Sequence, residues 1–288
     1  MKFAVNYINE EVMDLSEPNE VYIKYPGEKW DLDTLSKLCD RSFHVVLHGV
    51  IPSSGSILDP NLLNGFETFS KYIISTKQQW LSFHFDYKDK YGEPDYISTL
   101  EKNLKLIRSY FPDITILLGN LPPVDNIKDW CADPKLFSSI LEKYDLKMLL
   151  DIPHTQISAE YINIPFEDYI NQFPLDKVVE VHFSGLGFTK AGKLYDGHIM
   201  AEDRDYKKLE YTLPRCKNLK MLSLEFAPTR DYGNEVVAKE YRDERISEQL
   251  YKEQQIQLKR MVEMVKELNL DEEIVRWFNK FNLIKFYQ

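Results

Sequence analysis

The chain has 288 residues, of which 43% are hydrophobic and 13% aromatic, and this composition supports one large hydrophobic core. Its formal net charge is -10, so we expect no nucleic-acid partner, because nucleic-acid-binding proteins usually carry a basic face. No apolar stretch approaches the roughly 18 residues that a membrane-spanning helix needs, and we expect no membrane association.

The N-terminal segment and the cysteines point to a reducing compartment. Met1–Tyr7 lacks the long apolar region and the cleavage site of a signal peptide. The cysteines, Cys39, Cys131 and Cys216, are odd in number and widely spaced, which predicts neither disulfides nor a thiolate metal site. We therefore expect a cytoplasmic protein.

Eight short apolar or β-branched runs follow one another along the chain, and most are separated by stretches with helical periodicity. The runs are Lys2–Asn6, Glu20–Lys24, His44–His48, Trp80–Asp86, Ile114–Leu118, Leu146–Asp151, Val178–Phe183 and Leu219–Phe226. The helical stretches between the later runs are Asn61–Lys77, Pro94–Phe111, Pro134–Tyr144, Ala159–Phe173 and Tyr206–Leu213. Alternating strands and helices predict an α/β fold with parallel pairing, and eight units fit a closed (β/α)8 TIM barrel. An open doubly wound sheet is the alternative, because the first two units are compressed.

A long charged segment, Val236–Leu268, follows the eighth run. Its part from Ile246 to Leu268 has the apolar periodicity of an amphipathic helix, which we expect to pack on the barrel wall. A helix that binds a partner is the alternative. Because the sequence contains no repeat and no Pro/Gly-rich linker, residues 1–288 are predicted to form a single domain, with residues 236–288 as a C-terminal helical extension.

Five of the six histidines lie at the end of a predicted strand or just after it. They are His48, His84, His154, His182 and His198. Three carboxylates accompany them, since Asp151 ends the sixth run, Asp196 precedes His198 by two residues, and Glu225 lies near the end of the eighth run. The strand ends of a TIM barrel converge on one rim, where active sites are built. Imidazole and carboxylate ligands suit iron, zinc or manganese, so the sequence predicts a metal site at this rim.

Other polar strand residues have weaker assignments. Asp86 shares a face with His84 and is either an additional ligand or a cap of the following turn. Glu180 lies one pleat below His182 and could orient that ligand, while Lys147 is expected to pair with Glu180. The sixth histidine, His44, begins its strand and is predicted to be structural, near the barrel floor.

Successive segments with these residues resemble the motifs of one family. The segments are His48–Val50 with Ser53–Ser56, Trp80–His84, Ile116–Asn120, Leu149–His154, Val179–His182 and Asp196–His198. In this order and spacing they are similar to the multinuclear non-heme iron-dependent oxidative enzymes, the MNIO family, over residues 44–230. This family belongs to the xylose-isomerase-like barrels.

The resemblance implies two or three iron ions that use dioxygen to modify cysteine or other residues of a ribosomally made precursor peptide, often with a partner protein that delivers the peptide. It also implies a grouping of the ligands around three ions. The implied groups are His48 with His84, then Asp151 with His182 and Glu225, then His154 with Asp196 and His198.

Two positions depart from the family pattern. Family members usually carry a ligating Glu where this chain has Gly119, so the site of His48 and His84 lacks its carboxylate unless Asp86, Asn120 or water replaces it. We therefore expect two well-held ions and a third position that is open, weak or empty. The apolar residues that follow Glu225 indicate a different substrate pocket.

Three functions are compatible with this sequence. An iron-dependent oxidative enzyme that modifies a peptide or a small molecule is favoured by the ligand set and the motif series. A zinc- or manganese-dependent hydrolase or sugar isomerase/epimerase would use the same ligands without redox chemistry. A catalytically degenerate metal-binding scaffold would explain Gly119, although the eight remaining candidate ligands favour a working site.

Overall fold

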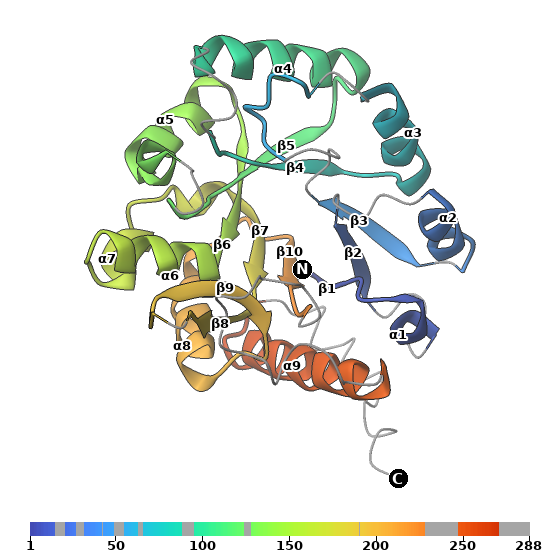
Figure 1. The fold of residues 1–288 in the computed structure, drawn as a ribbon, viewed down its shortest axis with the longest axis vertical. Coiled ribbons are helices and arrows are strands. Elements are labelled where there is room, and N and C mark those ends of the chain that lie inside the picture. The colour runs from blue at the N-terminus through green and yellow to red at the C-terminus, as the bar shows by residue number, and fades with distance from the viewer. Residues whose placement is uncertain are drawn as a thin grey trace.

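The computed structural model describes residues 1–14, 21–26, 32–41, 43–48, 55–62, 66–87, 95–123, 128–189, 191–227 and 247–270. In these residues, eight parallel strands close into a barrel (Figure 1). In order around the wall, the strands are β1 (Lys2–Asn6), β10 (Met221–Leu224), β7 (Val178–Phe183), β6 (Lys147–Asp151), β5 (Thr115–Gly119), β4 (Trp80–His84), β3 (His44–His48) and β2 (Tyr22–Pro26). The predicted TIM barrel is confirmed, and the open sheet is wrong.

Helices surround the strands on the outside of the barrel (Figure 1). The α-helices of the described residues are α1 (Glu10–Asp14), α2 (Leu32–Asp40), α3 (Phe66–Thr76), α4 (Tyr96–Tyr110), α5 (Pro134–Lys143), α6 (Ile152–Tyr161), α7 (Phe166–Ile170), α8 (Asp203–Thr212) and α9 (Ser247–Glu267). Short 3-10 turns are Asp129–Ala132, Leu175–Lys177 and Leu213–Arg215.

The apolar side chains form two layers because successive residues of a strand point to opposite faces. The larger layer lies between the strands and the helices. The smaller cluster comprises Ala4, Val46, Trp80, Leu117, Leu149, Val179 and Met221. Several of its members precede a rim residue on the same strand face, as Trp80 precedes His84 and Leu149 precedes Asp151. An apolar barrel interior thus supports the polar rim.

Several predicted elements have other bounds in the structure, among them the second strand and the helix predicted for Ala159–Phe173. The second strand begins two residues later than predicted, at Tyr22 rather than Glu20. The predicted helix Ala159–Phe173 is two helices, of which α6 starts at Ile152, directly after β6. The Asp151 side chain caps α6 by accepting a hydrogen bond from the backbone N–H of His154 (2.8 Å), and Pro153 suits the first turn. Because α6 buries residues all round its first two turns, it shows no amphipathic stripe in the sequence.

An antiparallel hairpin, β8 (Gly185–Phe188) and β9 (Leu194–Ile199), follows β7. From the sequence, only the part around Asp196 and His198 was expected to be extended. β9 packs against α6, and these two residues of β9 are predicted ligands. The hairpin thus brings ligands to the rim that no barrel strand carries.

The long helix α9 packs on the barrel next to α1 and β10 (Figure 1). Its buried face includes Leu250, Leu258, Met261 and Val265, which matches the predicted packing helix. Residues 236–246 and 271–288 of the predicted extension lie outside the described residues. In the part of the chain that is described, no helix is long and apolar enough to cross a membrane.

Candidate metal centre

The eight predicted ligands gather at the carboxyl ends of the barrel strands. His48, His84 and Asp151 are the last residues of β3, β4 and β6, His182 lies near the end of β7, and Glu225 directly follows β10. His154 lies in the first turn of α6, and Asp196 and His198 lie on β9. All except His84 and Asp196 are buried, and Asp196 exposes only 17% of its side chain. The closed barrel thus assembles residues that are up to 177 positions apart (from 48 to 225).

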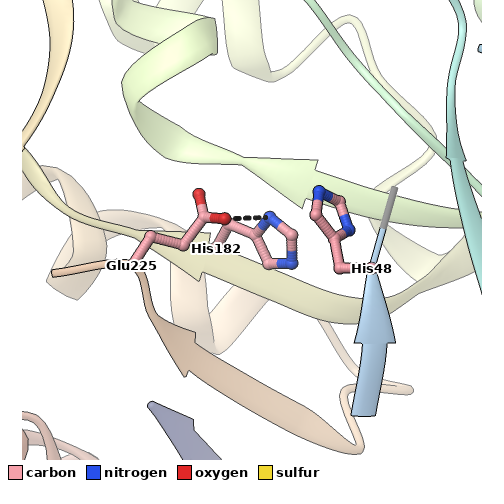
Figure 2. A group of neighbouring side chains, drawn as sticks. All are labelled: His48, His182 and Glu225. Atoms are coloured by element: carbon pink, nitrogen blue, oxygen red, sulfur yellow. Dashed lines mark ion pairs between the residues drawn. The ribbon is translucent and has the colours of Figure 1, made fainter. Parts of the chain in front are cut away.

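Three of these residues converge closely enough to hold one ion. One potential ligand atom from each of His48, His182 and Glu225 lies within 4.8 Å of the others. Figure 2 shows His182 between Glu225 and His48. His182 Nδ1 lies 3.4 Å from Glu225 Oε1 and 3.7 Å from Asp151 Oδ2. Asp151 therefore borders this group, as the resemblance implies.

A second group forms around Asp196. Its Oδ2 atom lies 2.6 Å from His198 Nε2 and 3.3 Å from His154 Nε2. His198 has a backbone φ of 47°, in the left-handed region that residues other than glycine seldom adopt. Such a conformation is retained at a cost and is common at functional sites. The three residues that the resemblance assigns to one ion are therefore in contact.

Four of the histidines have one ring nitrogen held by the protein, and the other nitrogen faces a carboxylate in three of them, His154, His182 and His198. The holding contacts are His48 Nδ1 with Ser82 Oγ (2.9 Å), His154 Nδ1 with the Asn120 carbonyl (2.9 Å), His182 Nε2 with Glu180 Oε1 (3.0 Å) and His198 Nδ1 with the Glu225 carbonyl (2.8 Å). Metal-binding histidines are typically oriented in this way, because the held nitrogen fixes the ring and its tautomer. The residues present therefore fit a metal centre.

His84 differs from these four. Its Nδ1 atom is buried and has no hydrogen-bond partner among the described residues. The ring lies 5.0 Å from that of His48. A Cβ atom at Gly119 would lie 3.5 Å from His84 Nδ1, in ordinary van der Waals contact. The missing side chain at Gly119 therefore leaves His84 without a neighbouring carboxylate from β5.

Burial and neighbouring charges set the protonation states. Burial, above all, lowers the pKa of His84 to about 3 and that of His48 well below its usual value, so both rings are neutral. Burial opposes the charge of Glu225, but His182 and Lys24 outweigh it and hold its pKa well below the ordinary range. A neutral imidazole and an ionised carboxylate are the forms that bind metal.

His154 has the opposite shift. Burial lowers its pKa, but the carboxylates of Asp151 and Asp196 outweigh burial and raise the pKa to about 9. Contacts with His198 and His154 likewise outweigh burial at Asp196 and keep its pKa well below the usual range. Without a metal ion, a proton on His154 thus balances part of the negative charge.

Glu180 orients His182 through a buried hydrogen-bond network. Besides the contact with His182, its carboxylate accepts hydrogen bonds from Trp80 Nε1 (3.0 Å) and Ser223 Oγ (2.8 Å). Burial raises the pKa of Glu180, but its bonds to charged and polar neighbours, led by His182, lower it overall. Glu180 therefore lies where the sequence predicted a residue that orients His182. The expected pairing of Glu180 with Lys147 is wrong, because Trp80, His182 and Ser223 are the partners of Glu180 in the barrel interior.

Lys24 is a residue of the centre that was not predicted from the sequence. This residue of β2 is 1% exposed, and its ammonium forms an ion pair with Glu225 and lies 3.3 Å from His182 Nδ1. The sequence did hold a signal, because Val21, Ile23 and Tyr25 alternate with Tyr22 and Lys24. That alternation places Lys24 on the inward face of a strand.

Of the two additional candidate ligands, Asn120 has a supporting position. Asn120 Oδ1 accepts from the Asp151 backbone N–H (2.8 Å), and Asn120 Nδ2 donates to the Asp151 carbonyl (3.1 Å). The amide thus fixes the turn that carries Asp151 and His154. Asp86 is fully buried after β4, near Cys131. At the opposite end of β3, the exposed His44 stacks on Tyr22 (5.0 Å between ring centroids), as expected for a residue outside the rim.

Closed β/α topology and a rim of candidate ligands define a TIM barrel with a candidate metal centre. The chain belongs to the family described as "RiPP precursor modification enzyme MbnB/TglH/ChrH", which is the MNIO family and matches residues 18–225. Its members modify the precursors of ribosomally made peptides, and the family is metal-dependent. The resemblance found in the sequence is therefore confirmed.

Solved structures agree on the fold. A D-tagatose 3-epimerase-like protein is similar with a TM-score of 0.61 and 16% identity, over 93% of this chain and 99% of that one. A xylose isomerase domain-containing protein from Salmonella typhimurium LT2 has a TM-score of 0.62 and 12% identity, over 90% and 96%. Endonuclease IV from Thermus thermophilus has a TM-score of 0.54 and 11% identity, over 93% and 100%. No curated protein matches the chain.

Proposed function

We propose that this protein is an iron-dependent oxidative enzyme that modifies a residue of a precursor peptide at the rim of the barrel. The observation that carries the proposal is the orientation of three imidazoles, each held at one nitrogen and directed at Asp151, Asp196 or Glu225 with the other; they are those of His154, His182 and His198. Donors of nitrogen and oxygen, with no thiolate among them, suit iron. Family membership supports the peptide substrate.

The residues have distinct parts in this function. His182, Glu225 and His48 would hold one ion, and His154, Asp196 and His198 would hold another, with Asp151 between the two groups. Bound iron would supply one-electron chemistry with dioxygen. Glu180 and Asn120 keep the ligands oriented through the hydrogen bonds described above. The hairpin β8–β9 shields the second group from water, since His198 is only 5% exposed.

The precursor peptide is the proposed substrate, and a partner protein that delivers it is the proposed partner. Both follow from the family rather than from a particular contact. The apolar residues Phe226 and Ala227 after Glu225 support a pocket that differs from that of other members, so we expect the substrate residue to differ as well.

Elemental analysis of protein purified without oxygen tests the metal. We expect about two iron ions per chain, and a loss of about one of them in His182→Ala and in Asp196→Ala. An exposed control, Glu101→Gln, should keep the wild-type content. Stoichiometric zinc or manganese in place of iron would contradict the proposal and favour the hydrolase or isomerase alternative. The absence of any retained metal would favour a degenerate scaffold.

Oxygen consumption tests the reaction. Iron-loaded protein, incubated with short cysteine-containing peptides encoded near its gene, should consume oxygen and change the peptide mass. The same mixture with His182→Ala should do neither. Unchanged peptide mass with every such candidate, despite full iron loading, would contradict the peptide-modifying role.

A further inference from the structure

The ammonium of Lys24 lies inside the candidate metal centre. In the barrel wall, β1 and β10 separate β2 from β7, so Lys24 reaches His182 only through the barrel interior. Its Nζ atom forms an ion pair with Glu225 Oε1 and lies 3.3 Å from His182 Nδ1. These two atoms belong to the residues that converge most closely with His48. A fixed positive charge is therefore in contact with two of the three potential ligands.

The hydrogen bonds of Glu180 determine which nitrogen of His182 can accept a hydrogen bond from Lys24. Because Trp80 and Ser223 donate to the Glu180 carboxylate, this group acts as an acceptor, and we assign His182 Nε2 as a donor to it. With its proton on Nε2, the neutral form of His182, which is the form that binds metal, has its lone pair on Nδ1, which faces the centre. An ammonium can only donate, so Lys24 uses this lone pair. A metal ion would need the same lone pair.

Moving the Lys24 ammonium away from Glu225 would cost free energy. It is 1% exposed, and a buried charge is tolerated only when it is paired. Its partner in the described structure is Glu225, so an ion that took over Glu225 would both remove this partner and repel the ammonium. A lysine that bound the substrate would instead have its ammonium exposed at the rim.

We propose that Lys24 competes with a metal ion for His182 Nδ1 and Glu225 Oε1 and thereby weakens the binding of the ion at the group of His48, His182 and Glu225. The inference rests on the proposed metal-dependent function. It makes Lys24 a residue that sets the metal affinity of this group. The group of His154, Asp196 and His198 is held together by its own contacts around Asp196, and it binds its ion independently of Lys24.

Neutral variants test this inference by metal binding in the absence of any substrate. Lys24→Met and Lys24→Gln should bind the ion at the His182 group at least about tenfold more tightly than wild type in competition with a chelator. Added metal should also raise their melting temperature more than that of wild type, because the ion would replace the missing positive charge.

Two controls separate the charge from the fold. Lys24→Arg keeps the positive charge and should keep the wild-type metal affinity. Lys147→Met removes a half-buried lysine at the other end of β6 and should also leave the affinity unchanged.

The outcomes distinguish this inference from the proposed function. Wild type and both neutral variants that bind no metal would contradict the function itself. Wild type that binds metal, together with folded neutral variants that bind no more and no tighter, would overturn the role of Lys24 alone. Neutral variants that stay insoluble even when produced and refolded with metal would overturn it too, because the ion would then not replace the ammonium.

Discussion

At the scale of single residues, the orientation of a rim histidine depends on the group that hydrogen-bonds the ring nitrogen facing away from the candidate metal centre. Glu180 holds His182, and carbonyl groups hold His154 and His198. These partners decide which nitrogen faces the carboxylates, and a ring that loses its partner can rotate or change tautomer. His84 Nδ1 has no such partner in the described residues, which fits its place beside Gly119.

Glu180→Gln is expected to weaken metal binding without removing a ligand. The amide keeps the shape of the side chain but loses the charge that fixes the His182 tautomer, so affinity at the His182 group should fall by about 10- to 100-fold. Competition with a chelator measures this. Glu101→Gln, at an exposed position, is the matched control. Equal affinities in the two variants would show that Glu180 has only a structural role.

Metal binding at His154 should release a proton. Its pKa of about 9 in the metal-free protein means that the ring is protonated at pH 7, whereas an ion requires the neutral form. Affinity at this group should therefore rise with pH up to about 9 and then level off. Calorimetry in two buffers of different ionisation enthalpy measures the release. His154→Gln should release about one proton fewer per chain, and an identical release would contradict this pKa.

At the scale of elements, the strand ends were largely predictable and the segments between them were not. The predicted bounds of β1, β3 and β7 agree with the structure, because those runs are apolar and bounded by polar residues. The start of α6 was missed, since this helix is buried on several sides and its capping Asp151 also reads as the end of a strand. The hairpin β8–β9 was missed because its glycines and polar residues resemble a loop.

The helix α9 allows a direct test of its packing. Met261 is fully buried on the barrel side, whereas Ile256 is 56% exposed. Met261→Ala should lower the free energy of unfolding by about 2–5 kcal/mol, because it leaves a cavity in the core. Ile256→Ala should change it by less than about 0.5 kcal/mol. Urea unfolding followed by circular dichroism measures both. Similar losses in the two variants would mean that α9 does not pack as described.

At the scale of the whole molecule, barrel closure concentrates negative charge at one end. Asp151, Asp196 and Glu225 meet there, and the protonated His154 and Lys24 offset part of their charge. Metal ions would offset the rest, so their removal should lower the stability of the whole folded chain. The predicted single domain and cytoplasmic location stay predictions.

Chelation is accordingly expected to lower the melting temperature. An ion present at about 100 times its dissociation constant stabilises a folded protein by about 2.7 kcal/mol. For a chain of this size that corresponds to roughly 4–5 °C. Differential scanning calorimetry before and after chelation, and after reloading with iron, measures the change. A melting temperature that neither falls on chelation nor recovers on reloading would contradict a tightly held ion.

The sequence by itself determined the barrel and the chemical type of the rim. Strand runs at regular spacing impose parallel pairing, and histidines at the ends of those runs must meet once the barrel closes. Only the tertiary structure decided which residues lie close together, because His48 and Lys24 reach His182 across the barrel and not along the chain. It also revealed that Asn120 acts as a support, a role that the sequence had predicted only for Glu180. Distances across a closed interior depend on register and side-chain direction, which local periodicity does not specify.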